Sequence, residues 1–252
     1  MTSGPTFSTR RIMHELRRRT LTVRGTERIT PDMLRITFEG DDLADFPSQS
    51  PDDHIKLFIA TGQGDVERRD YTPRRFDTAA RTLDIDFALH DAGPATRWAL
   101  AAKAGDLLEI GGPKGSMVVE GQPDWWLLIG DETALPAIGR RVEEAAQDVP
   151  VITVVSVVDS ANEQRFDTRA RHDAHWVHRP AASADNPQPL LDALTKLELP
   201  AGDGFIWIAA EARVARAVRD YVRQTLHHPH SAMKASGYWV KGRADAHEKL
   251  AD

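Results

Sequence analysis

The first half of the chain places apolar residues at every second position, as β-strands do. Residues 82–89 and 34–38 follow this alternation, and residues 54–60 form a third apolar run between Pro51 and Gly62. A period of two puts alternate side chains on one face, so these segments are predicted to be strands with one face in a core. Short strands separated by turns favour an antiparallel barrel or sandwich. One helix, over residues 96–103, is predicted to interrupt them.

After Pro123 the pattern changes to fully apolar runs that alternate with amphipathic segments. The apolar runs predict strands buried on both faces, with one short strand among them, at residues 125–129, 151–158, 176–178 and 205–209. Helical spacing of apolar residues predicts helices over 135–145, over 190–197 and from Glu211 onward. Strands alternating with helices are typical of a parallel sheet. The predicted fold class is therefore all-β followed by α/β, with a boundary near residues 121–123.

The composition is that of a globular protein large enough for two domains. Of 252 residues, 41% are hydrophobic and 28% are charged, which excludes a disordered or collagen-like chain. The absence of cysteine excludes disulfides, thiolate metal ligands and a cysteine nucleophile. A net charge of -6 argues against a nucleic-acid-binding protein. The apolar runs are far shorter than the roughly 18 residues of a membrane span, so we expect a cytoplasmic protein without membrane contact.

Arg69, Tyr71 and Thr72 stand in an order that resembles the arginine-x-tyrosine-serine/threonine flavin motif of the ferredoxin-reductase superfamily. A tyrosine ring can lie against an isoalloxazine, a hydroxyl can hydrogen-bond to its edge, and a guanidinium can pair with a pyrophosphate. Tyr71, Thr72 and Arg69 provide these three groups within four residues. Taken alone, the segment is equally well explained as the end of a strand with a solvated run of charges.

A second candidate lies where the predicted helix begins. His90, Ala95 and Thr96 surround the start of a helix that directly follows a strand. Unpaired N–H groups and the helix dipole at such a start favour an anion, here a flavin pyrophosphate. An ordinary capped helix explains the same residues without any ligand.

Six segments together are similar, in order and spacing, to those of the siderophore-interacting proteins. This family consists of FAD-dependent ferric-siderophore reductases within the ferredoxin-reductase superfamily. The six segments are residues 53–57, 69–74, 84–99, 111–116, 130–138 and 237–242. One departure is that Val240 and Lys241 stand where the family usually has two arginines, which leaves the basic substrate contacts open.

The resemblance implies a fold and a division into domains. An antiparallel Greek-key barrel that binds FAD is expected over residues 20–120. An α/β domain that binds NADPH or NADH on a parallel sheet is expected over residues 123–252. Residues 1–19 are expected to be an N-terminal arm, without the apolar segment of a secretory signal. Arg17, Arg18 and Arg19 could touch lipid or nucleic acid, but a solvated arm explains them better.

The resemblance also implies which residues hold the cofactors. FAD is expected against Arg69, Tyr71 and Thr72, with the pyrophosphate or ribityl chain near His90, Ala95 and Thr96. The nicotinamide nucleotide is expected after the first strand of the α/β domain, where open α/β sheets bind ligands. The residues implied there are Asp131, Glu132, Thr133 and Ala134.

Further residues are implied for the nucleotide and the substrate, each with a simpler alternative. Arg179 is the candidate partner of a ribose phosphate, although a surface arginine after a strand would look the same. Tyr238 and Trp239 are expected to cover the flavin from the nucleotide side, unless they only pack a terminal strand. A basic pocket for an anionic ferric siderophore is expected from residues that could equally be solvated charges: Lys56, Lys114 and either Lys241 or Arg243.

The implied activity explains why no catalytic acid, base or metal ligand is needed. A nicotinamide gives two electrons as hydride and a ferric centre accepts one, and flavin connects the two. Reduced iron is then held less tightly by hard oxygen ligands and is released for assimilation. Two groups of histidines are unfavourably spaced for binding a metal. They are His227, His228 and His230, and His172, His175 and His178.

Two other functions remain open on the sequence alone. The chain could be a flavin reductase or an electron-transfer partner of another protein, or a non-enzymatic carrier or sensor of siderophores. The residues from Gly130 to Ile138 argue against the carrier, which has no need of a nucleotide site. Neither the choice between NADH and NADPH nor the siderophore follows from the sequence, and a monomer is favoured.

Overall fold

The structure is a computed structural model that describes residues 6–61, 65–89, 93–243 and 248–249. The chain divides into two compact units, Arg11–Val118 and a second one made of Met1–Arg10 with Val119–Asp252. His90, one of the predicted FAD residues, lies outside the described residues. No helix within the described ranges is both long enough and apolar enough to cross a membrane.

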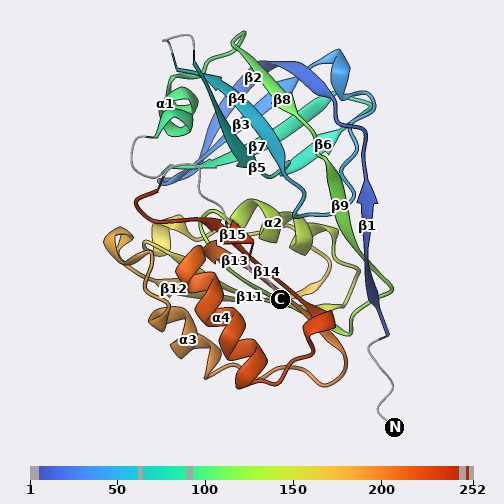
Figure 1. Cartoon of the computed structure of the whole chain (residues 1–252), viewed down its shortest axis with the longest axis vertical. Coiled ribbons are helices and arrows are strands. Elements are labelled where there is room, and N and C mark those ends of the chain that lie inside the picture. Colours follow the sequence, from blue (N-terminus) through green and yellow to red (C-terminus); the bar gives the residue numbers. More distant parts are fainter. Residues whose placement is uncertain (1–5, 62–64, 90–92, 244–247, 250–252) are drawn as a thin grey trace. The chain divides into compact units, whose positions relative to one another are not determined.

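The first unit is an antiparallel sheet of seven strands that curls round one core (Figure 1). The alternation in the sequence points Leu21, Ile36 and Ile85 into this core, where all three are fully buried. In spatial order the strands are β5 (Val66–Tyr71), β4 (Ile55–Ala60), β8 (Leu107–Gly111), β2 (Arg18–Thr30), β3 (Met33–Glu39), β7 (Thr82–Ala88) and β6 (Arg75–Asp77). The Tyr71 ring at the end of β5 packs on Phe87 of β7 with centroids 4.5 Å apart, so strands near opposite ends of the strand order lie against each other.

Helix α1 (Pro94–Ala101) closes part of the same core. Pro94 stands in its first turn, where the missing N–H costs no hydrogen bond. Ala95 and Ala99 are buried, and the Trp98 ring lies 6.0 Å from that of Phe87. The predicted helix is confirmed, beginning two residues earlier than the expected range.

A separate ladder pairs β1 (Ser8–Met13) with β9 (Gly115–Glu120). The N-terminal arm expected over residues 1–19 thus contains a strand, which the sequence hid because β1 is mostly polar and does not alternate. Arg10 Nε donates to Glu120 Oε1 at 2.5 Å. Phe7 is buried against Phe205, with ring centroids 5.9 Å apart, so these contacts hold the segment in place.

The second unit is a six-stranded sheet with helices on both faces (Figure 1). Its first five strands are parallel, and β15 pairs antiparallel to β14. The chain builds the sheet outward from β10 to β12, then returns to β13 on the other side of β10, so the strand order reverses between β10 and β13. In spatial order the strands are β12 (Arg171–His178), β11 (Pro150–Val157), β10 (Trp125–Asp131), β13 (Gly204–Glu211), β14 (Met233–Trp239) and β15 (Glu248–Lys249).

The helices of this unit cover a core that the apolar runs supply. Helices α3 and α4 share one core with the sheet, through Leu190, Val214 and Val218, while α2 lies against β10 and β11. The helices are α2 (Leu135–Glu144), α3 (Gln188–Leu194) and α4 (Ala212–Gln224). Short 3-10 turns occur at Asp41–Leu43, Ser160–Asn162, Ala181–Ser183 and His230–Ala232.

The predicted order of strands and helices is confirmed, with two strand boundaries corrected. β10 does not end before Gly130 but continues to Asp131, because Gly130 pairs with Val155 on one side and Ala209 on the other. β12 begins at Arg171 rather than at Trp176. Its first residues are polar because β12 is an edge strand that pairs only with β11.

Candidate functional site

The end of β5 holds the predicted flavin residues of the barrel. Tyr71 is half-buried against Phe87, and Thr72, the next residue, is buried. Burial raises the pKa of the Tyr71 phenol, an effect that the nearby Arg69 guanidinium opposes. Arg69 itself pairs with Glu67 and donates to the carbonyl of Arg68 at 2.8 Å. The segment therefore presents a neutral aromatic ring beside a hydroxyl group.

Two residues beyond Thr72, a buried group of charges fixes the start of β6. Asp86 in β7 is 3% exposed and accepts two hydrogen bonds from Arg35, at 2.7 and 2.8 Å. Arg74 is also 3% exposed, and its Nε lies 3.8 Å from Asp86 Oδ2. Its backbone N–H donates to the carbonyl of Asp84 at 2.9 Å. Arg74 is thus a guanidinium anchored directly after the flavin-type segment.

The start of α1 offers N–H groups to an anion. Its N-cap residue is Gly93, which has no side chain to cap the helix, and the first turn contains no acidic residue. Ala95 and Thr96 lie in this turn and are buried. Helix starts of this kind favour an anionic ligand.

These groups of the barrel fit the chemistry of FAD. A flavin dinucleotide needs an aromatic surface for the ring, hydrogen-bonding groups for its edge, and positive or N–H donors for the pyrophosphate. The first unit supplies a group of each kind. The aromatic surface is the ring of Tyr71, the hydrogen-bonding group is the hydroxyl of Thr72, and the positive or N–H donors are Arg74 and the uncapped start of α1.

The two predicted substrate lysines of the barrel lie in strand β4 and in the loop that follows its neighbour β8. Lys56 in β4 lies opposite Gly111 in β8, and its Nζ donates to Asp70 Oδ1 at 2.8 Å. Lys114 is exposed in the loop that follows β8. The register therefore places Lys56 beside the strand end from which the Lys114 loop begins.

The backbone of the Lys114 loop is held by the segment that precedes β2 and by its first residues. Arg19, 2% exposed, donates from Nη1 to the carbonyl of Gly112 at 3.1 Å. Gly112 N–H donates to the carbonyl of Arg17 at 3.0 Å, and His14 N–H donates to that of Lys114 at 3.0 Å. Arg17 and Arg19, expected in a solvated arm or at its end, thus have structural roles here.

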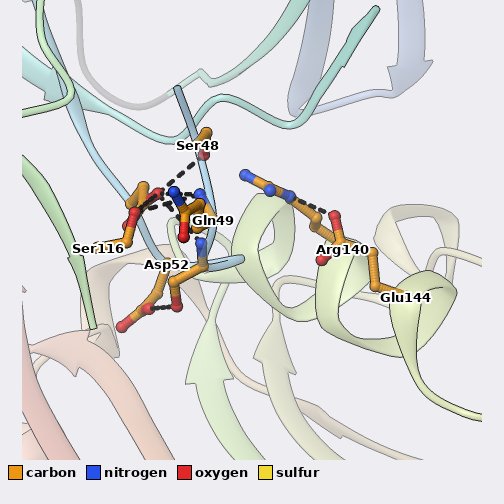
Figure 2. A network of polar contacts seen from close by, with 8 residues as sticks. Ser48, Gln49, Asp52, Ser116, Arg140 and Glu144 are labelled. Atoms are coloured by element: carbon orange, nitrogen blue, oxygen red, sulfur yellow. Dashed lines mark hydrogen bonds and ion pairs between the residues drawn. The ribbon is translucent and has the colours of Figure 1, made fainter. Parts of the chain in front are cut away.

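A buried carboxylate secures the far side of the same loop. Asp53 Oδ2 accepts hydrogen bonds from the hydroxyls of Ser48 at 2.9 Å and Ser116 at 2.6 Å, and from the N–H of Gln49 at 3.0 Å (Figure 2). Because the Ser116 hydroxyl donates to Asp53, His14 Nε2 must donate to Ser116 Oγ, 2.8 Å away. The loop carrying Lys114 is thus fixed from both ends.

In the second unit, Asp131 lies at the carboxyl end of β10, where the strand order reverses. Its Oδ1 accepts from Thr133 N at 2.9 Å and from Thr133 Oγ1 at 2.5 Å. Its Oδ2 accepts from Glu211 N at 2.8 Å and from Trp239 Nε1 at 2.9 Å. Asp131, Thr133 and Trp239, all predicted nucleotide or flavin residues, are therefore brought together.

Helix α2 begins directly after these residues and also has an uncapped start. Its N-cap is Ala134, and its first turn contains no acidic side chain. A side chain at Gly130 would come within 2.6 Å of Ala134 Cβ and 2.7 Å of the Ala209 carbonyl, so glycine permits this close packing. Farther along the helix, Arg140 Nε pairs with Glu144 Oε1 at 2.6 Å (Figure 2).

Arg179 and Glu132 form a buried ion pair at the same edge of the sheet. Arg179 follows β12 and is 3% exposed, and its Nη2 donates to Glu132 Oε2 at 2.6 Å. Its Nη1 is buried without a hydrogen-bond partner in the described part of the chain. An unsatisfied buried donor of this kind fits the phosphate or ribose oxygen of a nucleotide. The uncapped start of α2 adds further N–H donors.

Lys241 and Arg243, the alternative substrate bases, differ in their surroundings. Lys241 Nζ donates to Asp185 Oδ1 at 2.7 Å and also to the carbonyl of Ala182. Its hydrogen bond holds the pKa of Asp185 below the ordinary value. Arg243 is exposed in the turn after β14. Lys241 thus ties the end of β14 to the loop after β12.

The histidine groups do not form shared clusters. His172 and His175 point to opposite sides of β12, as their odd spacing in a strand requires. His178 pairs with Glu163 at 2.8 Å, and His228 Nε2 lies 3.0 Å from the carbonyl of Ala232. Among the described residues no three histidine, aspartate or glutamate side chains are grouped as metal ligands would be.

Several residues of the site were missed from the sequence. Asp53 and Ser116 stand inside segments that resemble the family, but their hydrogen bond joins positions 63 residues apart. Arg74 and Asp86 also lie inside matching segments, and alternation alone indicated only the strand around Asp86. The alternation placed Asp86 on the polar face of its strand, so no local signal indicated that its side chain is buried.

Comparisons with known proteins cover nearly the whole chain. The sequence model of the siderophore-interacting protein family matches residues 123–242, and that of the siderophore-interacting FAD-binding domain matches residues 22–68 and 61–117. The NADPH-dependent ferric-chelate reductase of Escherichia coli (strain K12) is 33% identical over 250 residues, covering 91% of this chain and 95% of that protein.

A further relative and a solved structure agree with this. The ferric vibriobactin reductase ViuB of Vibrio cholerae serotype O1 is 28% identical over 237 residues, covering 85% of this chain and 86% of that protein. The crystal structure of a siderophore utilization protein from T. fusca superposes with a TM-score of 0.89 at 34% identity, covering 96% of this chain and all of that one.

Proposed function

Because the chain belongs to the siderophore-interacting protein family, we propose that it is an FAD-dependent oxidoreductase that transfers electrons from NADPH or NADH to ferric siderophores. Its antiparallel barrel followed by a parallel sheet with helices is the ferredoxin-reductase-like fold. The observation that carries the proposal is that one chain holds both donor sets. One set suits a flavin in the barrel, and the other suits a nucleotide at the edge of the sheet.

In this proposal the barrel domain, residues 20–120, holds FAD. The Tyr71 ring provides the surface for the isoalloxazine, and the Thr72 hydroxyl hydrogen-bonds to its edge. Arg69 and the start of α1, with Ala95 and Thr96, face the pyrophosphate or ribityl chain, and Arg74 adds a second guanidinium. When bound, FAD supplies the exchange between hydride transfer and single-electron transfer.

The α/β domain, residues 123–252, holds the nicotinamide nucleotide at the carboxyl ends of its strands. The nucleotide lies beside Asp131, Glu132, Thr133 and Ala134, and its phosphates face the uncapped first turn of α2. Arg179 meets the phosphate or hydroxyl of a ribose through its buried Nη1. Tyr238 and Trp239 cover the flavin from this side.

The ferric siderophore is the substrate, held by charge and not by ligands to iron. Lys56 and Lys114, with Lys241 or Arg243, attract an anionic chelate to a protein whose net charge is negative. Between the last two we favour Arg243, because Lys241 is engaged by Asp185. Reduction to iron(II) weakens the hold of hard oxygen ligands, and the protein works as a cytoplasmic monomer that releases iron for assimilation.

One spectroscopic experiment tests the proposal. The purified protein is expected to be yellow, to lose its flavin absorbance when NADPH is added without oxygen, and to regain it when a ferric siderophore follows. Iron(II) is then detected by a ferrous chelator. A folded protein that takes up no FAD contradicts the proposal. Equal rates of reduction of free flavin and ferric chelate would favour a flavin reductase. Binding of the chelate without oxidation of the nucleotide would favour a carrier.

A further inference from the structure

The carboxylate of Asp131 has no hydrogen-bonding capacity left for a ligand. Each of its two oxygens accepts two hydrogen bonds, from Thr133 on one side and from Glu211 and Trp239 on the other. These four hydrogen bonds occupy the roughly four lone-pair sites of the carboxylate. The residue is 1% exposed, so a nucleotide at this edge of the sheet finds the carboxylate already saturated.

The partners of Asp131 come from the ends of three strands. Thr133 follows β10, Glu211 is the last residue of β13, and Trp239 is the last residue of β14. Glu211 and Trp239 are 80 and 108 residues away in the sequence. One buried side chain therefore sets the relative positions of the strand ends on both sides of the point where the strand order reverses.

Glu211 extends this connection to helix α4 and to the turn after β14. Its side chain caps α4 by accepting from Arg213 N at 2.7 Å and Val214 N at 3.3 Å. Its other oxygen accepts from the N–H of Lys241 at 3.2 Å. The backbone that carries Trp239 and Lys241 is thus fixed from Asp131 through Glu211.

The indole of Trp239 is oriented by the same carboxylate. Its Nε1–H is bound to Asp131, while the side chain as a whole is only half-buried. All four donors to Asp131 are neutral, so the carboxylate is stabilised by dipoles, and hydrogen bonds to a charged acceptor are stronger than neutral ones. The direction of the Trp239 ring therefore depends on Asp131 being a carboxylate.

We propose that Asp131 is a positioning residue for the nucleotide site: it holds Trp239 and the ends of β10, β13 and β14 in place and does not itself contact the nucleotide. This inference rests on the proposed function, because it takes this edge of the sheet as the nucleotide site. It replaces the sequence-based expectation that Asp131 is a direct ligand.

The substitution Asp131→Asn separates the two roles. An amide keeps the size of the side chain, but its NH2 group cannot accept hydrogen bonds, so at least two of the four donors lose their partner. We expect the Trp239 indole N–H to exchange with solvent about tenfold faster, as loss of one charge-assisted hydrogen bond implies. We expect the dissociation constant for NADP⁺ to rise by a similar factor, with the FAD content unchanged.

Both quantities can be measured on the full-length protein loaded with FAD. Nitrogen-15 NMR resolves the indole N–H signals of the six tryptophans, and the signal that disappears in Trp239→Phe identifies Trp239. Calorimetric titration with NADP⁺, which cannot reduce the flavin, gives the affinity without turnover. Trp239→Phe keeps an aromatic ring but loses the donor together with one of the two fused rings, so it too should weaken NADP⁺ binding, and the double variant should be no weaker than Asp131→Asn alone.

A matched control lies at the other end of the same strand. Asp124 directly precedes β10, and its Oδ2 accepts from Asp203 N at 2.7 Å, which joins β10 to β13 at their opposite ends. Asp124→Asn makes the same change of charge. It should lower the melting temperature without changing Trp239 exchange or NADP⁺ affinity.

Two outcomes with Asp131→Asn overturn the inference. Unchanged Trp239 exchange and NADP⁺ affinity in Asp131→Asn show that the carboxylate positions nothing. Lost affinity with intact Trp239 protection shows that Asp131 is a direct ligand. If Asp131→Asn does not fold, the Trp239→Phe titration decides, and an unchanged affinity there is equally decisive against the inference. A different result separates the inference from the proposed function. If the variants show that Asp131 and Trp239 act together on NADP⁺ binding, but the protein reduces no ferric siderophore, the proposed function is contradicted and the inference still holds.

Discussion

The barrel and the parallel sheet each bury an aspartate beside the residues proposed to bind a cofactor, but they stabilise its charge in different ways. Asp86 in the barrel is paired with the guanidinium of Arg35, and Arg74 lies 3.8 Å away. Asp131 in the sheet accepts only from neutral donors. In the barrel a negative charge anchors positive side chains, whereas in the sheet a set of acceptor sites holds strand ends together.

The largest expected effect is on stability, from breaking the charged arrangement of the barrel. Asp86→Asn removes the carboxylate that pairs with Arg35 and lies 3.8 Å from the buried Arg74, and removing one partner of a buried pair costs about 3 kcal/mol. Urea unfolding should show this loss. Asp84→Asn, on the same strand, changes a carboxylate that accepts a hydrogen bond from the neutral Thr37 hydroxyl and should cost under about 1 kcal/mol. Equal losses in the two variants would mean that the ion pair contributes nothing beyond a hydrogen bond.

A smaller effect is expected on the Michaelis constants, which should distinguish the proposed substrate residues of the barrel from the proposed nucleotide residues of the sheet. Replacing Lys56 and Lys114 by alanine removes two positive charges and should raise KM for an anionic ferric catecholate about tenfold at low salt. KM for NADPH should stay unchanged. Arg179→Gln should raise KM for NADPH and leave KM for the catecholate unchanged, because it removes the guanidinium with the unpaired Nη1.

The kinetic prediction has two checks. Lys103→Ala, a change at an exposed lysine paired with Asp106 in the same unit, should leave both constants unchanged. An uncharged ferric hydroxamate should be much less affected than the catecholate. If the double lysine variant slowed flavin reduction by NADPH as strongly as chelate reduction, the assignment of a substrate pocket would be wrong.

The smallest expected effect is a pH dependence confined to the α/β unit. Burial lowers the pKa of His172 and of His228 below the ordinary value of 6.5. The unfolded chain therefore binds protons near pH 6.5 that the folded protein does not bind, so stability is lost as the pH falls below that value. Because both imidazoles are half-exposed, we expect a loss of only a few tenths of a kcal/mol between pH 7.5 and 5.5.

Thermal melting at the two pH values measures this effect. His172→Gln with His228→Gln should reduce the difference in melting temperature. His175→Gln, which changes a histidine beside Asp173 on the same strand as His172, serves as the control. An unchanged pH dependence in the double variant would show that other groups cause it.

Much of the fold could be predicted because strands and helices are encoded locally. A period of two in residues 82–89 and continuous apolar runs such as 151–158 led to the strands β7 and β11. The polar start of β12 and the whole of β1 were missed, because an edge strand or a two-stranded ladder needs no apolar face. The flavin and nucleotide segments were indicated by their resemblance to a family, and not by periodicity.

The amino-acid sequence by itself determined the two kinds of domain and their order, since these depend on residues close together in the chain, and it indicated the short segments to which we assign cofactor binding. The tertiary structure alone decided what the polar residues in those segments do. Asp131 and Trp239 meet across 108 positions, and Asp53 and Ser116 across 63. Such pairs form only after the strands have taken their places, and so no local pattern distinguishes a side chain that binds a ligand from one that holds its neighbours.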